Sequence, residues 1–324
     1  MRSRQKKNKY IFGPVPSRRL GLSLGVDIVP FKTCSFDCTY CQLGRTTEKT
    51  ITITEHLKTA EMLKELELSL RNGPTPDYIT FSGSGEPTLN SRLGEMISAV
   101  KKMTSVPVAV LTNAGQLIPS VRDNLYKADL VIPSLDAVTQ QTFERVNRPC
   151  KGIRIEHIIA NLKIFCRYFQ GQTWLEIMLV KGINDTQAEL TKMAMVLWGI
   201  NVNKIQLSTV TRPPCEPGAL ALSRADLEFS KTILGKRAEI IDGLQGRIRK
   251  VSSLYREDDI IALLKRRPCT INDIANLMGV HRNELAKYLE EMQRGGKVES
   301  LSHASQIYFR SLDDHHCQRL TEYV

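Results

Sequence analysis

Three cysteines in one short segment are the residues of this chain best suited to chemistry. Cys34, Cys38 and Cys41 lie in Cys-Ser-Phe-Asp-Cys-Thr-Tyr-Cys, and no fourth cysteine follows nearby. Three thiolates from one loop can hold three irons of a four-iron cluster and leave the fourth iron without a protein ligand. Catalytic metal sites keep an open position of this kind, whereas structural sites are closed. The spacing therefore predicts a reactive metal site.

Two simpler interpretations of these thiols stay open from the spacing alone. One is a zinc site with a remote fourth ligand, and the other is three thiols that bind nothing. The spacing matches neither the Cys-x2-Cys-x2-Cys-x3-Cys run of bacterial ferredoxins nor paired zinc knuckles.

The Cys-x3-Cys-x2-Cys loop, with Tyr40 before its third cysteine, resembles the radical S-adenosylmethionine (SAM) enzymes. This resemblance implies a [4Fe-4S] cluster on Cys34, Cys38 and Cys41, whose open iron chelates SAM through its amino and carboxylate groups. An electron from the cluster then cleaves SAM to methionine and a 5'-deoxyadenosyl radical. A flavodoxin- or ferredoxin-type protein is the expected one-electron donor, and Tyr40 is an expected cofactor contact.

A second motif follows the expected strand 77–82. The run Gly83-Ser-Gly-Glu-Pro-Thr88 resembles the Gly-Gly-Glu-Pro motif of the same superfamily, with its first glycine one position upstream. Glycine lets a ligand approach the backbone, and a carboxylate can accept hydrogen bonds from the SAM ammonium. A phosphate-binding loop is the alternative, but it lacks the third glycine and its glutamate would repel phosphate. The expected cofactor-binding residues here are Gly83, Gly85, Glu86 and Pro87.

Polar residues close the next two expected strands. Asn113 follows strand 106–112, and Ser134 and Asp136 lie at the end of strand 128–135. By resemblance, all three are candidates for the SAM ribose and carboxylate. The alternative for each is a turn or helix cap, because Ser, Asn and Asp favour both positions. The sequence predicts no residue for catalysis on the substrate.

Six strand-like runs alternate with helical patterns, as in βα units. The expected strands are 23–29, 77–82, 106–112, 128–135, 173–180 and 203–210. The expected helices are 55–71, 91–103, 119–127, 155–170, 186–199 and 223–242. Complete TIM barrels have eight units, so the predicted fold class is α/β with a partial (β/α)6 TIM-like barrel over 11–245. Its site should lie at the carboxyl ends of the strands.

A smaller domain is expected over 255–312. Helical patterns at 258–267, 271–278 and 282–294 precede a hairpin at 298–309, an order that resembles winged-helix domains. The third helix mixes basic and acidic residues, namely Arg282, Lys287, Arg294, Glu284, Glu290 and Glu291. Such a helix is a poor match for duplex DNA, so a substrate- or protein-docking arm is favoured over a transcription factor. Residues 1–10 and 313–324 are expected to be disordered tails.

The charge and composition of the chain indicate which classes of binding partner to expect. The 324 residues carry a net charge of +11, yet the last seventy residues contain ten lysines and arginines against eleven acids. The excess positive charge therefore lies in the barrel and the first nine residues, where it can attract RNA. The chain shows no apolar run of membrane-spanning length and no signal-peptide pattern. Eight cysteines without a secretion signal suggest reduced thiols or metal ligands, so we expect a cytoplasmic protein without a membrane partner.

Arginine residues occur in three loops expected at the open end of the barrel. They are Arg18 and Arg19, Arg148, and Arg212. Guanidinium groups suit carboxylate or phosphate, although solvated surface arginine is the alternative for each. Cys150 and Cys215 lie beside two of these loops, where either could donate a hydrogen atom, touch a second cluster, or be an inert thiol.

The runs 12–27 and 29–44 resemble a prokaryotic radical SAM group related to the wyosine-forming tRNA enzymes. Those enzymes carry additional N-terminal cysteines for a second cluster, and here no cysteine precedes Cys34. The leading hypothesis is a radical SAM enzyme acting on an unidentified substrate, with an RNA nucleotide as the first candidate. The alternatives are a radical SAM maturase or activase acting on a peptide or protein, and a DNA-binding regulator that senses through an iron–sulfur cluster.

Overall fold

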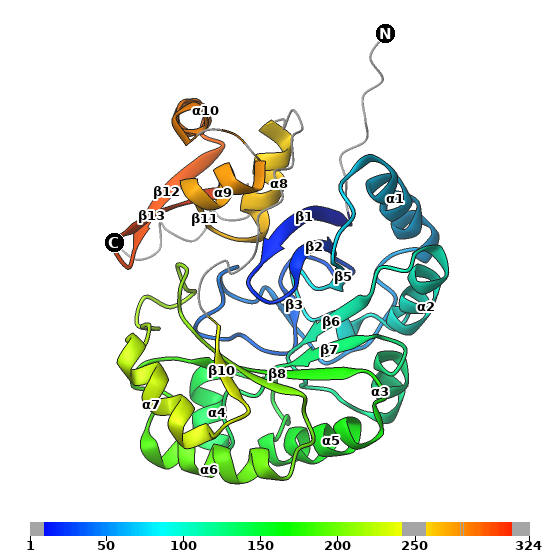
Figure 1. The fold of residues 1–324 in the computed structure, drawn as a ribbon, viewed down its shortest axis with the longest axis vertical. Helices are drawn as coiled ribbons and strands as arrows, with labels where there is room; N and C mark the ends of the chain where they lie inside the picture. The colour runs from blue at the N-terminus through cyan, green and yellow to red at the C-terminus, as the bar shows by residue number, and fades with distance from the viewer. Residues whose placement is uncertain (1–9, 242–256, 279, 281, 313–324) are drawn as a thin grey trace. The chain divides into compact units, whose positions relative to one another are not determined.

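An eight-stranded sheet is the framework of the larger part of the molecule (Figure 1). The computed structural model describes residues 10–241, 257–278, 280 and 282–312. The strand order is β1-β2-β5-β6-β7-β8-β9-β10. Neighbouring strands from β2 to β10 are parallel, and β1 pairs with β2 antiparallel. The strands are β1 (Ile11–Ser17), β2 (Gly21–Val26), β5 (Tyr78–Phe81), β6 (Val108–Thr112), β7 (Leu130–Pro133), β8 (Gln172–Leu179), β9 (Lys204–Thr209) and β10 (Ala238–Ile240).

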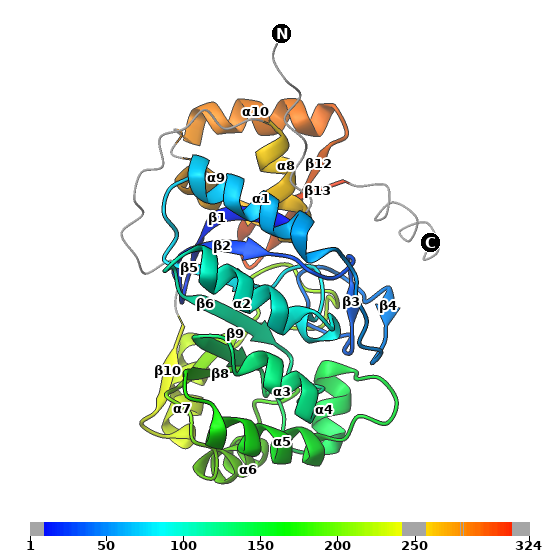
Figure 2. The same cartoon turned by 90° about the vertical axis from the view of Figure 1, so that its right-hand side faces the viewer.

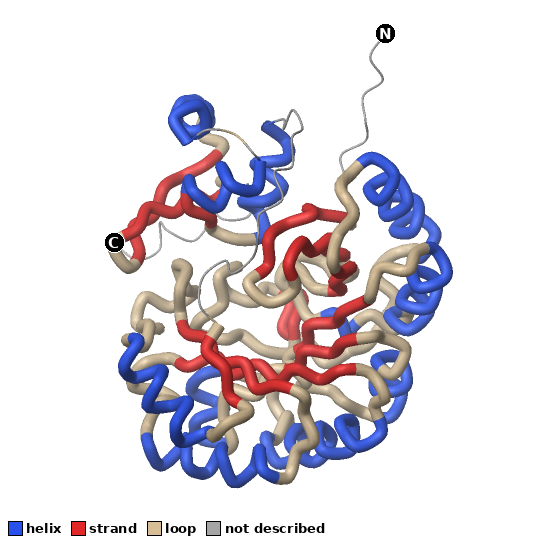
Figure 3. The backbone as a smooth tube through the Cα atoms, viewed as in Figure 1, coloured by secondary structure: helices blue, strands red, loops and turns tan. Residues whose placement is uncertain are grey.

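Helices cover one face of this curved sheet, as the tube view shows (Figure 3). They are α1 (Thr59–Asn72), α2 (Leu93–Met103), α3 (Pro119–Leu125), α4 (Gln140–Asn147), α5 (Ile155–Tyr168), α6 (Gln187–Trp198) and α7 (Arg224–Leu234). Alternate strand residues face the two sides, so Val108 and Val110 pack in the main core while Ala109 packs in a second cluster with Trp174 and Leu20. This parallel α/β sheet is consistent with the expected partial barrel.

All six expected strands are present, although most are shorter than expected. Two further strands, β1 and β10, were not expected. Proline lacks an N–H group and is therefore found mainly in edge strands. Strand β1 is such an edge strand, and its Pro14 and Pro16 are the reason that the sequence pattern did not predict a strand there. The expected helix 223–242 is wrong in its second half, because α7 ends at Leu234, Gly235 follows with φ +92°, and β10 begins at Ala238. The short helix α4 was also missed.

The carboxyl ends of the parallel strands meet at one edge of the sheet, and the expected site loops lie there. A cysteine-bearing loop follows β2, and a 3-10 turn, η1 (Pro87–Leu89), follows β5. A short parallel pair, β3 (Thr33–Cys34) and β4 (Glu48–Lys49), lies apart from the main sheet (Figure 2).

The second part of the molecule is described by itself. Three helices accompany a three-stranded antiparallel sheet of order β11-β13-β12. The elements are α8 (Glu257–Arg266), β11 (Cys269–Thr270), α9 (Ile271–Met278), α10 (Arg282–Arg294), β12 (Val298–His303) and β13 (Gln306–Ser311). The expected helices and hairpin are therefore present, and β11 is an addition.

The two expected tails fall almost wholly outside the described residues, which exclude 1–9 and 313–324. Tyr10 belongs to the α/β unit instead, because it is buried and its hydroxyl lies 3.1 Å from Glu61 Oε2. Among the described residues, no helix combines the length and apolar character that crossing a membrane requires.

Candidate functional site

The cysteine loop, residues 32–49, is closed at its base by the β3–β4 pair. Cys34 stands opposite Lys49 in this pair. Inside the loop, the Cys41 amide donates to the Cys38 carbonyl (3.1 Å) and the Gly44 amide donates to the Cys41 carbonyl (3.2 Å). Two successive tight turns thus hold the second and third thiols on one short segment.

Each of the three sulfurs accepts a hydrogen bond from a different side chain. The donors are Lys32 Nζ to Cys41 (3.1 Å), Asn147 Nδ2 to Cys38 (3.4 Å) and Asn113 Nδ2 to Cys34 (3.5 Å). Such N–H donors stabilise thiolates and adjust the properties of iron–sulfur clusters. The surroundings of the thiols therefore suit sulfur that carries negative charge.

Burial favours the neutral thiol at Cys34 and Cys38 when no metal is bound. Burial raises the pKa of the Cys34 thiol to about 12, and it raises the pKa of the Cys38 thiol well above its usual value. Metal ligation requires the thiolate, so a bound cationic centre must displace these protons. Three thiols with their own N–H donors fit a cluster that supplies this charge.

The segment 83–88 packs directly against the cysteine loop. The Lys32 amide donates to the Ser84 carbonyl (2.6 Å), and the Glu86 amide donates to the Thr33 carbonyl (3.0 Å). A Cβ atom at Gly85 would lie 2.0 Å from the Thr33 carbonyl oxygen. Glycine is therefore required at this position by the close approach of two backbones.

Gly83 has a different reason to be glycine. Its φ is +148°, and a Cβ atom there would meet the Asp27 carboxyl group at 2.5 Å. The next amide, of Ser84, donates to Asp27 Oδ2 at 3.1 Å. Asp27 thus anchors the start of the segment from the end of β2.

Glu86 is buried, and its carboxylate accepts hydrogen bonds from neighbouring residues. It accepts hydrogen bonds from Thr88 N (3.1 Å), Thr88 Oγ1 (2.7 Å), Thr112 Oγ1 (2.7 Å) and Asn113 N (2.7 Å). Three of these donors reach Oε1 and one reaches Oε2. Burial raises the pKa of Glu86, while the four bonds act in the opposite direction. Glu86 therefore joins the ends of β5 and β6 and caps η1, which begins at Pro87.

Four expected cofactor contacts line one pocket beside the cysteine loop. The expected residues in its wall are Tyr40, Asn113, Ser134 and Asp136. The other wall residues are Phe36, Leu135, Phe143, Asn147, Ile155 and Ile158. The structure thus brings together polar groups from four separate parts of the chain.

Asp136 is the centre of the polar side of this pocket. Its Oδ2 accepts hydrogen bonds from the Tyr40 hydroxyl and from Asn147 Nδ2 (2.7 Å), and its Oδ1 accepts one from the Met178 amide (2.8 Å). Burial raises the pKa of Asp136 to about 6. Burial, followed by the Asp136 charge, raises the pKa of Tyr40 well above its usual value, so Tyr40 remains a hydroxyl donor at neutral pH.

The family model described as the radical SAM superfamily matches residues 28–194, which contain the cysteine loop, segment 83–88 and all of the pocket-wall residues named above. The chain is a member of the radical SAM superfamily. It is also 31% identical over 306 residues to a UPF0026 protein of Methanocaldococcus jannaschii, a match that covers 92% of this chain and 94% of that protein.

Other similarities are partial. A Brachyspira hyodysenteriae protein named GTPase Obg is 37% identical over 300 residues, but this chain spans only 44% of its length. A probable dual-specificity RNA methyltransferase of Thermotoga neapolitana is 23% identical over 67% of this chain and 62% of that protein. The crystal structure of a radical SAM methyltransferase from Sphaerobacter thermophilus shares the fold, with a TM-score of 0.50 at 19% identity over 67% and 65% of the two chains.

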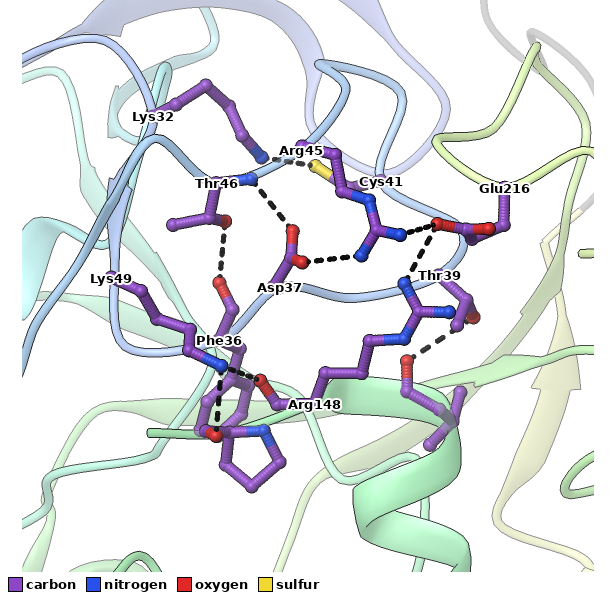
Figure 4. Close-up of polar contacts among 12 residues, drawn as sticks. Lys32, Phe36, Asp37, Thr39, Cys41, Arg45, Thr46, Lys49, Arg148 and Glu216 are labelled. Atoms are coloured by element: carbon purple, nitrogen blue, oxygen red, sulfur yellow. Dashed lines mark hydrogen bonds and ion pairs between the residues drawn. The ribbon is translucent and has the colours of Figure 1, made fainter. Parts of the chain in front are cut away.

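A network of ion pairs joins the cysteine loop of this radical SAM protein to neighbouring segments (Figure 4). Arg45 contacts Asp37 (2.9 Å) and Glu216 (2.6 Å), and Arg148 contacts the same Glu216 oxygen (2.8 Å). The Glu216 amide also donates to the Thr39 carbonyl (2.9 Å). The network ties the loop to the end of α4 and to the segment after β9.

The expected position of Arg18 and Arg19 at the open end of the radical SAM fold is wrong. Arg18 and Arg19 lie in the turn between β1 and β2, at the amino ends of the parallel strands, because β2 begins only at Gly21. Arg19 forms an ion pair with Glu176 of β8, and these two side chains are only 12% and 14% exposed. Arg212 groups with the C-terminal unit. Arg148, in contrast, lies beside the cysteine loop as expected.

The two extra cysteines considered from the sequence are neutral thiols. Cys150 is adjacent to the cysteine loop, where its amide donates to the Ser35 carbonyl (2.8 Å). Burial raises the pKa of the Cys150 thiol, and it raises that of Cys215 to about 11. Neither thiol has the lowered pKa typical of a reactive cysteine.

Sequence reasoning missed two residues of this radical SAM site. Lys32 lies two positions before Cys34, and its ammonium donates to Cys41. Asn147 donates to both Asp136 and Cys38, whereas its neighbour Arg148 was the expected functional residue of this segment. The sequence signal was proximity to the cysteine motif for Lys32 and proximity to Arg148 for Asn147.

Proposed function

We propose that this chain is a cytoplasmic radical SAM enzyme with one [4Fe-4S] cluster on Cys34, Cys38 and Cys41 and with SAM bound in the adjacent pocket. Reductive cleavage of SAM would produce a 5'-deoxyadenosyl radical that abstracts hydrogen from a separate substrate. The observation that carries this proposal is one loop with three cysteines, each sulfur receiving its own N–H donor, beside a pocket with polar and aromatic walls. The cluster, when bound, supplies the electron and the open iron.

The chain's own residues bind and orient SAM in this proposal. Tyr40 and Ser134 present hydroxyl groups that can pair with ribose hydroxyls and the methionine carboxylate. Asn113 lies in the same wall, but its amide nitrogen already donates to Cys34 and Ser35, so it takes a positioning role. Glu86 takes a positioning role because its carboxylate already accepts four hydrogen bonds. The backbone oxygens of segment 83–88 are therefore our candidates for the SAM ammonium.

The apolar wall would exclude water from the reacting atoms. Phe36 and Phe143 pack edge to face with ring centroids 5.2 Å apart, and Ile155 and Ile158 complete that side. An enclosed apolar surface suits the adenine ring and protects a reactive intermediate from side reactions.

The decisive experiment is anaerobic reconstitution with iron and sulfide, followed by reduction with dithionite in the presence of SAM. We expect 5'-deoxyadenosine and methionine from the native protein. Alanine at Cys34, Cys38 or Cys41 should reduce the yield at least about 100-fold, the upper end of the cost of losing even an outer-shell partner. The matched control is Cys150→Ala, which removes a neighbouring thiol and should retain cleavage within about twofold.

Two results would refute the assignment. One is full SAM cleavage by all three cysteine variants. The other is stoichiometric zinc instead of iron in protein purified without oxygen, since a closed zinc site offers no electron.

For the substrate, we propose an RNA nucleotide. The positive charge outside the last seventy residues and the similarity to a protein named as an RNA methyltransferase both support it. The C-terminal unit, which we propose to be winged-helix-like, would then act as a docking arm. RNA affinity should fall steeply with added salt, because phosphate contacts release counterions. A flat salt response would favour the alternative, a peptide or protein substrate.

A flavodoxin- or ferredoxin-type protein is the proposed electron donor. Turnover with such a donor and its reductase, in place of dithionite, tests this part separately.

A further inference from the structure

Lys32 is a buried cation at the centre of the cysteine site. Its residue is only 3% exposed, and its Nζ lies 3.1 Å from Cys41 Sγ (Figure 4). Its φ of +57° is unusual for a residue with a side chain. The backbone is fixed on both sides, because its amide donates to the Ser84 carbonyl (2.6 Å) and its carbonyl accepts from the Glu48 amide (3.1 Å). This framework directs a long flexible side chain toward sulfur.

The Lys32 ammonium is buried, and it donates directly to the Cys41 sulfur at 3.1 Å. Asp37, a carboxylate of the same loop, is paired with Arg45 instead (2.9 Å). Burying an ammonium is costly unless an anionic group compensates it. A sulfur that carries negative charge provides that compensation.

The other two sulfur donors differ from Lys32 in charge. Asn113 and Asn147 are neutral amides, at 3.5 and 3.4 Å from their sulfurs. A hydrogen bond from an ionised donor is roughly twice as strong as a neutral one. Only the lysine therefore opposes the extra negative charge that a cluster gains on one-electron reduction.

We propose that Lys32 is a redox-tuning residue, whose ammonium donates to the Cys41 sulfur and stabilises the reduced cluster over the oxidised one. The inference rests on the proposed function, because only a bound cluster can accept the electron. In that step one electron from an external reductant enters the cluster, no bond is broken, and Lys32 retains its proton. The hydrogen bond to sulfur and the fixed positive charge are the two components.

Four variants separate these components. Lys32→Met keeps the length and removes both charge and donor. Lys32→Gln keeps an N–H donor without charge, and Lys32→Arg keeps the charge. The matched control is Lys49→Met on the same loop, because Lys49 is exposed and its Nζ contacts the Arg148 and Pro149 carbonyls (both 3.4 Å).

The test is a redox titration of the reconstituted proteins without SAM, followed by electron paramagnetic resonance of the reduced cluster. We expect reduction of Lys32→Met to be about tenfold less favourable than in the native protein, which is about 59 mV for a one-electron couple. Lys32→Arg should restore most of this loss, Lys32→Gln should lie between, and Lys49→Met should match the native protein.

The outcomes distinguish the inference from the function on which it rests. If the native protein takes up no four-iron cluster, the proposed function fails first. If Lys32→Met and Lys32→Gln carry full iron and have the same reduction potential as the native protein, the tuning role is overturned. If both lose iron while remaining folded by circular dichroism, Lys32 assembles the site instead, which also overturns the proposal. A change in SAM affinity at unchanged potential would assign Lys32 to SAM.

Discussion

The cysteine loop and segment 83–88 meet at the same edge of the sheet, yet they use their polar side chains in opposite ways. The three sulfurs receive donors from β6, α4 and Lys32, and remain available to a metal centre. The Glu86 carboxylate accepts four hydrogen bonds from Thr88, Thr112 and Asn113. The cysteine loop leaves its sulfur atoms available for binding. Segment 83–88 instead uses the Glu86 carboxylate to hold neighbouring backbone in place.

The difference follows from the chemistry of the two groups. A thiol is a weak hydrogen-bond acceptor and a strong metal ligand, so it can be buried without full hydrogen bonding. A carboxylate in the same setting needs several donors to offset its lost hydration. A motif match therefore identifies both sets of residues as important without showing which of them contacts a ligand.

The largest effect should come from Gly85→Ala, which tests whether the two loops depend on each other. The added Cβ would lie 2.0 Å from the Thr33 carbonyl oxygen, so the backbone beside Cys34 must shift. We expect a loss of about 5 kcal/mol in unfolding free energy and failure to load iron, measured by urea unfolding and iron content. The control is Gly218→Ala, where a Cβ meets nothing within 4 Å. Full iron loading by Gly85→Ala would contradict the dependence of the cysteine loop on segment 83–88.

Glu86→Ala tests the positioning role directly. It leaves four buried donors without their acceptor, and we expect about 4 kcal/mol of lost stability in urea unfolding. Glu67→Ala removes an exposed carboxylate paired with Arg71 and should change stability by less than about 0.5 kcal/mol. Should Glu86→Ala fold as stably as the control variant, its hydrogen bonds do not hold the strand ends.

Asp136 sharpens the comparison, because it is a buried carboxylate in the pocket wall. Burial raises its pKa from the usual 3.8 to about 6 in the folded protein, so the folded protein binds this proton more tightly than the unfolded chain does. The stabilisation is complete below about pH 4 and is lost as pH rises through about 6, a change of about 3 kcal/mol. Asp136→Asn should lack this component. The measurement is the unfolding free energy of both proteins between pH 4 and 7. If it varies with pH in the same way in both, Asp136 does not have the raised pKa.

The smallest effect should come from Arg45→Ala, on the outer side of the cysteine loop. Arg45 is 51% exposed, so its ion pairs with Asp37 and Glu216 should contribute less than about 1 kcal/mol and weaken in high salt. Iron content should stay at the native level. Arg71→Ala, which removes a helix-surface ion pair, provides the reference value for comparison. A loss several times larger than the reference would mean that this network helps to shape the site.

Much of the α/β framework could be predicted because its signals are local. Apolar runs such as Leu130–Pro133 and helical spacing in α5 depend only on neighbouring residues. The missed elements have conflicting local signals: β1 contains two prolines, and β10 is three residues long and continues an apparent helix. Gly235 after α7 was a readable stop signal that was overlooked.

The sequence alone determined the identity and spacing of the three thiols, the glycine–glutamate segment and the polar residues at two strand ends. Only the tertiary structure decided what each group does there. The Asn113–Cys34 and Asn147–Cys38 contacts join residues 79 and 109 positions apart. Such pairings depend on how strands are ordered in a sheet, and no local periodicity carries that information. Glu86 shows the same limit, because its partners Thr112 and Asn113 come from the next strand.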